Sequence, residues 1–416
     1  MQIHDLLQDA VEASRTLYSV SDETISTILK DTAHTLLENK ALILEANAKD
    51  LANMDESDPK HDRLMLTDER LQGIAGDMCN VAGLPFPVRK TLSETTLPNG
   101  MVVRKVSVPF GVIGIIYEAR PNVTCDVFSL CLRSGNACVL KGGADAYYSN
   151  MALVTIIRWV LAKYWVNPAV CTLLPADRAA TATLLGAVGF VDLVIPRGSS
   201  ELINYVRENS RIPVIETGAG ICHTYFDKDG DKEKGRSIAN NAKTRRVSVC
   251  NALDCLVIHR ERLQDLPYIC EKLAENLVEV YADQYSFEAL DGRYPVELLH
   301  HAVPESFGTE FLDYKMSIRT VADINEAIAH ISQHGSKHSE CIISESADMV
   351  RLFLQAIDAA CVYANVSTAF TDGAQFGMGA EIGISTQKLH ARGPMALNEL
   401  VTYKYIIEGN GQIRLQ

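Results

Sequence analysis

Short apolar runs that alternate with helical stretches dominate the middle of the chain and constrain its fold most strongly. The runs occupy residues 111–116, 137–140, 169–174 and 191–195. The segments between them, notably 150–165 and 178–188, have the length and composition of helices. Short apolar runs bounded by helices are typical of strands buried on both faces, and their repetition predicts a parallel, doubly wound sheet.

The flanking sequence predicts a helix and two further strands. From Ser21, a residue suited to cap a helix, apolar residues recur with the spacing of one helix face. A turn at 98–100 precedes a candidate strand at 101–106, and another strong strand candidate lies at 400–407.

The second half of the chain predicts another α/β unit. Before that unit begins, two more strands of the first unit are expected at 213–215 and 223–226. The charged stretch 227–235 is interpreted as a solvated loop at a domain boundary, and the second unit is predicted to run from Ser237 to about Ala364.

Charge and cysteine content limit the class of protein. The 416 residues suggest two or three domains, and a net charge of −13 argues against nucleic acid or an anionic membrane as the main partner. The eleven cysteines form no CxxC pair, and no signal peptide is recognised, which is typical of reduced thiols in a cytosol. The apolar runs are too short to span a bilayer. We therefore expect a cytoplasmic protein, and no metal site.

One cysteine has the surroundings of a nucleophile. Cys250 follows Lys243, Arg245 and Arg246, and nearby positive charge lowers the pKa of a thiol and raises its thiolate fraction. The alternative is a structural cysteine at the entry to the strand that follows, which is the more common situation for any one cysteine among eleven. Cys255 is the rival thiol, but its place inside that apolar strand makes a structural role its expected one.

Polar loops at strand ends are the remaining candidates for a site. Lys141, Gly142 and Gly143 follow the candidate strand 137–140, and the carboxyl end of a strand is where a doubly wound sheet binds ligands, although a plain turn is the alternative. Such loops converge on one crevice, so a shared site is expected. The other polar loops lie at 117–122, 216–220, 376–381 and 390–394.

The run from Pro109 to Thr124 closely resembles a signature of the gamma-glutamyl phosphate reductases, also called glutamate-5-semialdehyde dehydrogenases, in the aldehyde dehydrogenase superfamily. Further blocks in the same order resemble that family along nearly the whole chain, so the joint match is highly specific. These blocks are 132–136, 139–143, 213–218, Cys250-Asn251 and the run from 370 to 394.

The resemblance implies an aldehyde dehydrogenase-like α/β fold, with two doubly wound domains and a small β oligomerisation element. The implied NADP-binding domain comprises residues 1–97, 109–230 and 366–395. Residues 231–365 would form the catalytic domain with the nucleophilic cysteine. Residues 98–108 and 396–416 would form the oligomerisation element.

The implied reaction is the NADPH-dependent reduction of L-glutamyl 5-phosphate to L-glutamate 5-semialdehyde and phosphate, the second step of proline biosynthesis. Cys250 stands at the position of the family nucleophile, which favours it over Cys255, and Asn122 stands at that of the oxyanion-binding asparagine. The positions expected to bind NADP are Lys141, Gly142, Glu216 and Glu310.

The implied substrate carries a phosphate and an α-carboxylate, which need cations or N–H groups as partners. Arg120, Lys243 and Arg392 lie in loops that resemble the family's site and are expected to bind these anions, although a surface salt bridge is the alternative for each. We also expect a homo-oligomer, a dimer or larger, and an association with glutamate 5-kinase.

Three positions depart from the family pattern. Ala369 stands where many members have arginine, Ser199 replaces a glycine and Ile221 replaces an asparagine. These departures bear on substrate affinity and cofactor fit more than on the type of reaction. A hydrolytic or CoA-dependent aldehyde dehydrogenase and a non-catalytic protein of the same fold remain the alternatives.

Overall fold

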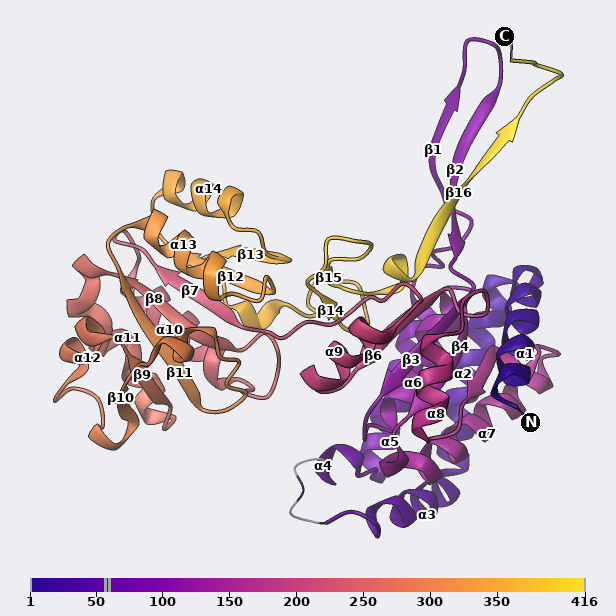
Figure 1. The fold of residues 1–416 in the computed structure, drawn as a ribbon, viewed down its shortest axis with the longest axis horizontal. Coiled ribbons are helices and arrows are strands. Elements are labelled where there is room, and N and C mark those ends of the chain that lie inside the picture. Colours follow the sequence, from indigo (N-terminus) through magenta and orange to yellow (C-terminus); the bar gives the residue numbers. More distant parts are fainter. Residues whose placement is uncertain (1, 56–57, 59–60, 415–416) are drawn as a thin grey trace. The chain divides into compact units, whose positions relative to one another are not determined.

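The computed structural model describes residues 2–55, 58 and 61–414, which form two compact units (Figure 1). The first unit comprises Met1–Thr217, Gly377–Gly383 and Met395–Gln416, and the second comprises Gly218–Phe376 and Ile384–Pro394. No helix in the described part of the chain is long and apolar enough to cross a membrane.

The first unit is built on a parallel sheet with strand order β5-β4-β3-β6, as the alternating runs predict. Its strands are β3 (Val112–Tyr117), β4 (Ala137–Gly142), β5 (Cys171–Leu173) and β6 (Leu193–Arg197). All residues of β3 and β4 are buried, because helices cover both faces of such a sheet. The chain reverses its direction of travel across the sheet between β3 and β6, which is where sheets of this kind bind ligands.

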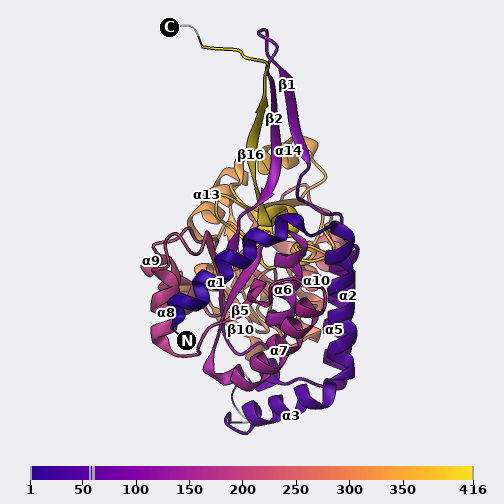
Figure 2. The same ribbon diagram turned by 90° about the vertical axis from the view of Figure 1, so that its right-hand side faces the viewer.

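Helices surround this sheet and complete the hydrophobic core. They are α1 (Ile3–Thr16), α2 (Asp22–Glu38), α3 (Lys40–Leu51), α4 (His61–Leu64), α5 (Asp68–Gly83), α6 (Asn122–Arg133), α7 (Tyr147–Lys163), α8 (Arg178–Leu185) and α9 (Ser200–Asn209). Ser21 caps α2 as expected, because its side chain accepts a hydrogen bond from the Thr24 N–H. Helices α2 and α5 pack side by side (Figure 2).

A three-stranded antiparallel sheet of order β1-β2-β16 extends from the first unit (Figure 1). Its strands are β1 (Thr91–Thr96), β2 (Val102–Pro109) and β16 (Val401–Glu408). The predicted turn is present, and Gly100 supplies the positive φ of 85° that the turn requires. The strand predictions at 101–106 and 400–407 are confirmed.

The second unit holds a parallel sheet of order β10-β9-β11-β8-β7-β12-β13. Its strands are β7 (Cys222–Phe226), β8 (Leu253–His259), β9 (Glu279–Ala282), β10 (Leu299–His301), β11 (Lys315–Val321), β12 (Ser339–Ile343) and β13 (Cys361–Ala364). Helices α10 (Lys232–Thr244), α11 (Leu266–Glu275), α12 (Gln284–Leu290), α13 (Ile324–His334) and α14 (Ala347–Ala356) cover it, and β14 (Ile384–Ser385) pairs with β15 (Gly393–Pro394).

Successive residues of β8 enter different cores, because side chains alternate across a strand. Leu256 and Ile258 join the core cluster that includes α11, whereas Cys255 and Val257 join the cluster that includes α13 and α14. The two-sheet α/β architecture with a small antiparallel sheet agrees with the fold expected from the sequence.

Two local predictions are wrong. Residues 213–215 form no strand, since the described backbone there makes only an isolated bridge between Val194 and Val214. The stretch 227–235 is not a loop throughout, because Asp231 accepts hydrogen bonds from the N–H groups of Glu233 and Lys234 and starts α10. The compact units divide at Thr217/Gly218, earlier than the expected division at 230/231, because β7 joins the second sheet. Most of 366–395, expected in the NADP-binding domain, also lies in the second unit.

Candidate active site

Cys250 lies in the second unit, in the loop between the end of α10 and the start of β8, and is half-buried. The thiol of Cys222, at the start of β7, donates to the Cys250 carbonyl oxygen at 3.2 Å. The rival thiol, Cys255, is fully buried within β8, and burial raises its pKa to about 12. A half-buried loop cysteine is the better candidate for a nucleophile, because the thiolate is the reactive form and burial in apolar surroundings disfavours it.

The backbone of Gly220 packs directly against the backbone of Cys250. A Cβ atom at position 220 would meet the carbonyl oxygen, the carbonyl carbon and the Cα of Cys250, so no side chain fits there. The Gly220 N–H donates to Glu310 Oε1 at 2.8 Å, which holds this glycine in place. Glu310 therefore supports the Cys250 loop through Gly220.

Asn251 anchors the other side of the same loop. Its side-chain amide donates to the backbone carbonyl oxygens of Thr371 at 2.9 Å and Ala369 at 3.4 Å. The backbone carbonyl oxygen of Asn251 accepts from the Thr368 hydroxyl at 2.8 Å. The methyl group of Ala369, one of the departures from the family pattern, is buried beside this contact.

Lys243 does not present its charge to an open surface. Its side chain is fully buried at the end of α10, with Nζ 3.7 Å from Asp254 Oδ1. Burial lowers the pKa of Lys243 against the effect of Asp254, and burial raises the pKa of Asp254 to about 6 against the effect of Lys243. The expected contact between Lys243 and a substrate anion is therefore not supported, whereas Arg245 and Arg246 are exposed.

Arg392 forms an ion pair with Asp358, with Nη2 and Oδ1 2.8 Å apart. Asp358 also contacts Lys388 at 2.9 Å and Lys337 at 3.8 Å. The hydrogen bonds from Lys388 and Arg392 lower the pKa of Asp358 to about 2. The three cations Arg392, Lys388 and Lys337 thus surround the single carboxylate of Asp358, which leaves an excess of positive charge.

Asn122 begins α6 in the first unit, and its side-chain amide donates to Asp126 Oδ2 at 3.0 Å. Burial raises the pKa of Asp126 to about 6, although the hydrogen bond from Asn122 opposes this shift. Asp126 thereby orients the amide of Asn122. Sequence reasoning missed Asp126, although its i+4 spacing from Asn122 on a helix is a signal that could have found it. Arg120 lies half-buried in the loop that leads to Asn122.

Lys141 and Gly142 are the last residues of β4, and so lie within the strand rather than after it. Lys141 is 6% exposed, and its ammonium group donates to the carbonyl oxygens of Gly142 at 3.0 Å and Ala176 at 3.2 Å. Burial lowers the pKa of Lys141. The absence of a side chain at Gly142 is explained by packing, because a Cβ there would meet Asn150 and Tyr117.

Glu118 and Ser199 mark the point where the chain reverses across the first sheet. They follow β3 and β6, and the Ser199 N–H and hydroxyl both bond to the Glu118 carboxylate at 3.0 Å. Glu216, farther along the first unit, has a carboxylate oxygen 3.7 Å from the guanidinium of Arg207.

The predicted site residues fall into two groups by compact unit. The first unit holds Arg120, Asn122, Lys141, Gly142 and Glu216. The second holds Lys243, Cys250, Glu310 and Arg392, of which Glu310 and Cys250 are linked through Gly220. Gly220 and Cys222 were missed as supports of the cysteine, because their contacts with it depend on how β7 pairs with β8.

The chain is closely similar to known proteins over its whole length, although no family model matches it. It is 71% identical over 413 residues to a gamma-glutamyl phosphate reductase of Azobacteroides pseudotrichonymphae, covering 99% of each chain. The crystal structure of gamma-glutamyl phosphate reductase from Thermotoga maritima matches with a TM-score of 0.96 and 37% identity, covering 100% of both chains.

A more distant match concerns the fold alone. An acetylating aldehyde dehydrogenase from Geobacillus thermoglucosidasius has a TM-score of 0.69 at 14% identity, covering 100% of this chain and 98% of that one. The aldehyde dehydrogenase-like fold and the family expected from the sequence are thus both confirmed. The chain belongs to the gamma-glutamyl phosphate reductase family.

Proposed function

We propose that this chain reduces L-glutamyl 5-phosphate to L-glutamate 5-semialdehyde and phosphate with NADPH, as the second step of proline biosynthesis from glutamate. The observation that carries the proposal is the full-length identity to a gamma-glutamyl phosphate reductase. The supported, half-buried Cys250 loop is the chemical feature that agrees with it.

Cys250 is the proposed nucleophile. Its thiolate attacks the acyl carbon of the substrate, the carbon–sulfur bond forms, the carbon–oxygen bond to phosphate breaks, and phosphate leaves with the electron pair. The product of this step is a thioester on Cys250. A bound NADPH supplies the hydride that reduces the acyl carbon. Release of the aldehyde then regenerates the Cys250 thiolate, which is ready for another substrate molecule.

Asn122 and the Cys250 N–H are proposed to bind the oxyanion that develops during attack. A side-chain amide has two N–H groups, and the hydrogen bond to Asp126 uses one of them. The other can donate to the oxyanion, while Asp126 fixes the plane of the amide. Removing one donor of this kind typically costs about 3 kcal/mol of transition-state stabilisation.

Lys141 is the proposed anchor for the cofactor. An ammonium group has three N–H groups, and the described residues accept from two of those of Lys141. A buried cation at the carboxyl end of a parallel sheet, with one N–H left to donate, fits a ribose hydroxyl. Glu310 is proposed to accept from a ribose hydroxyl through Oε2, since Oε1 accepts from Gly220. Gly142 and Glu216 complete the proposed set for NADP.

The two arginines are proposed to bind the anionic groups of the substrate. Arg120 is half-buried and the Arg392 side chain is 28% exposed, so part of each side chain is accessible to a ligand. Lys243 was expected in the same role, but its side chain is fully buried beside Asp254, so no contact with the substrate is proposed for it.

We extend the proposal to assembly and location. The sheet β1-β2-β16 presents exposed apolar side chains, including Tyr405 and Ile407, and is proposed to join copies of the chain into a homo-oligomer. Because acyl phosphates hydrolyse readily, association with glutamate 5-kinase would protect the intermediate. A cytoplasmic location is proposed from the sequence, because eleven cysteines without a CxxC pair are typical of reduced thiols in a cytosol.

The test is the phosphate-dependent reduction of NADP by glutamate 5-semialdehyde, which is the reverse reaction. Cys250→Ala and Cys250→Ser should abolish it, whereas the matched control Cys255→Ala should retain it. Activity without inorganic phosphate would instead favour a hydrolytic aldehyde dehydrogenase, and a requirement for CoA would favour a CoA-dependent one. A folded Cys250→Ala variant with wild-type activity would refute the proposed nucleophile.

A further inference from the structure

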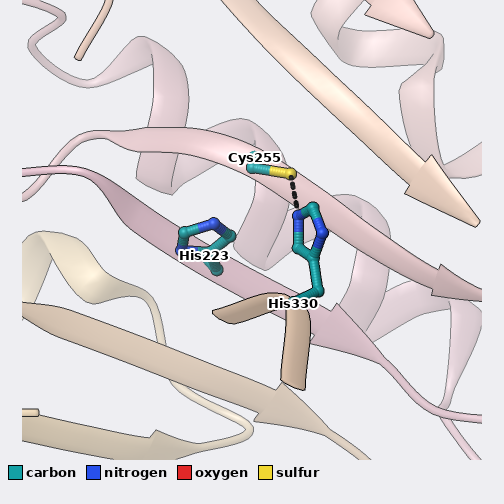
Figure 3. A group of neighbouring side chains, drawn as sticks. All are labelled: His223, Cys255 and His330. Atoms are coloured by element: carbon teal, nitrogen blue, oxygen red, sulfur yellow. Dashed lines mark hydrogen bonds between the residues drawn. The ribbon is translucent and has the colours of Figure 1, made fainter. Parts of the chain in front are cut away.

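Three buried side chains with metal-binding atoms meet inside the second unit, apart from the residues proposed for the reduction. They are His223 on β7, Cys255 on β8 and His330 on α13 (Figure 3). Their ligand atoms all lie within 4.8 Å of one another. Figure 3 shows the contact between Cys255 and His330, with the imidazole of His223 beside them on the neighbouring strand.

The strand register explains why these side chains share one face of the sheet. His223 pairs with Cys255 across β7 and β8, and with Glu340 across β7 and β12. Residues paired in this way on adjacent strands point to the same side. Helix α13 packs over that side and contributes His330.

The hydrogen bonds of His223 leave one ring nitrogen facing this group. The residue is fully buried, and its Nδ1 lies 3.1 Å from Glu340 Oε2, which also accepts from the His223 backbone N–H at 2.8 Å. Its Nε2 is buried and has no hydrogen-bond partner among the described residues. An unpaired buried polar atom costs about 1–3 kcal/mol, so a partner for Nε2 is expected.

The Glu340–His223 pair has the arrangement that prepares a histidine to bind a metal. A carboxylate that accepts from one ring nitrogen fixes the tautomer, so the other nitrogen carries the lone pair. That other nitrogen is the unpartnered Nε2. The neighbouring Cys255 Sγ lies 3.7 Å from His330 Nε2, so these two ligand atoms are already in contact.

The observed separations suit a tetrahedral ion. Bond lengths of about 2.0–2.1 Å to nitrogen and about 2.3 Å to sulfur place a nitrogen and a sulfur ligand about 3.6 Å apart in a tetrahedral zinc site. The separation of 3.7 Å between Cys255 Sγ and His330 Nε2 agrees with this value. Small rotations of the His223 ring would bring its Nε2 into range, since no ligand atom is more than 4.8 Å from another.

We propose that His223, Cys255 and His330 bind one divalent transition-metal ion of the zinc class. Two imidazoles and a thiolate are ligands that such ions prefer, and a water molecule would complete the tetrahedron. On binding, the Cys255 thiol loses its proton to solvent and a metal–sulfur bond forms, with no change of oxidation state. His330 also lines a surface pocket with Phe307, Arg319 and His334, which offers the ion a path inward.

No metal site was predicted from the sequence, because the ligands are far apart along the chain and follow no ligand-spacing motif. The ion would join β7, β8 and α13 and so stabilise the second unit. The site is independent of the proposed reduction, since none of its ligands is proposed to touch substrate or cofactor.

The experiment measures binding of the metal alone to the full chain after treatment with a chelator. Equilibrium dialysis should give one Zn²⁺ per chain, both in the wild type and in Cys250→Ala, which removes the reactive thiol. Co²⁺ should give thiolate-to-metal charge-transfer absorption and the intense visible bands of a tetrahedral complex. Cys255→Ala should lose the bound ion and the charge-transfer absorption, whereas the matched control Cys270→Ala, another fully buried thiol of this unit, should keep both.

A further variant tests the role of the carboxylate. Glu340→Gln should weaken binding by roughly 10- to 100-fold, the usual effect of removing the partner of a metal-binding histidine. Circular dichroism of the metal-free variants shows whether each one is folded. If Cys255→Ala is unfolded, the conservative variant Cys255→Ser decides the matter, because it should lose the thiolate-to-metal absorption while filling nearly the same space.

Three outcomes overturn the proposal. The first is the absence of stoichiometric binding to the wild type. The second is binding that survives in folded Cys255→Ala, which would assign the ion to the neighbouring pair His330 and His334 on α13. The third is loss of the ion and its charge-transfer absorption in Cys250→Ala, which would assign it to the reactive thiol.

Discussion

Substitution of Gly220 by alanine should displace the nucleophile without removing any chemical group. The added Cβ would lie 2.5 Å from the Cα of Cys250 and closer still to its carbonyl group. The backbone φ of Gly220 is outside the left-handed region, so alanine is excluded here by space rather than by its own conformation. Because the neighbouring atoms belong to the backbone, no side-chain rotation can relieve the overlap.

The size of the displacement follows from these distances. Ordinary contact begins at 3.4 Å, so Cys250 Cα and the residue 220 loop must separate by about 0.9 Å, and the carbonyl oxygen by more. A misplacement of about 1 Å in a catalytic group can reduce the rate about 100-fold, equivalent to about 2.7 kcal/mol. We therefore expect kcat/KM to fall by about 100-fold in Gly220→Ala.

The assay is phosphate-dependent NADP reduction with glutamate semialdehyde, together with NADPH binding measured by fluorescence. Binding of NADPH should weaken much less than kcat/KM falls, since the proposed cofactor anchor Lys141 lies in the other compact unit and only the contact proposed for Glu310, which accepts from the Gly220 N–H, is disturbed. Gly76→Ala is the matched control, because a Cβ at this exposed helical position meets nothing within 4 Å. It should retain full activity and add about 0.5–1 kcal/mol of stability. Activity of Gly220→Ala within a few-fold of the wild type would refute the reasoning.

Three further variants test other parts of the site. Lys141→Ala should raise the NADPH dissociation constant by about 10- to 100-fold, because hydrogen bonds from a charged group contribute about 1.5–3 kcal/mol; unchanged binding in a titration would remove this residue from the cofactor site. Asp126→Ala should lower kcat by about 5- to 10-fold by releasing the Asn122 amide, whereas Asp126→Asn keeps an acceptor and should stay close to wild type; equal losses of kcat in both would contradict the orienting role. Asp358→Asn should be less stable than the wild type near pH 7, because the folded-state pKa of Asp358, lowered to about 2, makes ionisation favour folding above its unfolded pKa of about 3.9. That difference in the free energy of unfolding should shrink as the pH falls toward 2, and a pH-independent difference in denaturant titrations would contradict the assignment.

The features that could be predicted from the sequence are those encoded by neighbouring residues. Ser21 and the residues after it predicted α2, and the apolar runs predicted the parallel strands β3 and β4, because capping and burial depend on local pattern. Cys250 could be singled out because cations precede it and because its segment resembles a family motif. The loop predicted for 227–235 was wrong, because Asp231 could not be distinguished from the other charged residues of this stretch as the N-cap of α10.

The contacts that depend on strand register could not be predicted. Lys243 looked like a cation available to a ligand, but the packing of α10 against β8 buries it beside Asp254. The pairing of β7 with β8 places His223 opposite Cys255, although the sequence around each residue does not indicate that the two are neighbours. The role of Gly220 could not be predicted either, since only the fold shows that its backbone contacts that of Cys250.

Formation of the thioester on Cys250 can be measured by rapid mixing with glutamate semialdehyde and NADP in the absence of phosphate. Without phosphate to accept the acyl group, the wild type should give a burst of about one NADPH per active site, with a glutamyl group on the Cys250 peptide by mass spectrometry. Addition of phosphate should then start steady turnover. A burst that persists in Cys250→Ala, or a glutamyl group found on another cysteine, would contradict the role proposed for Cys250.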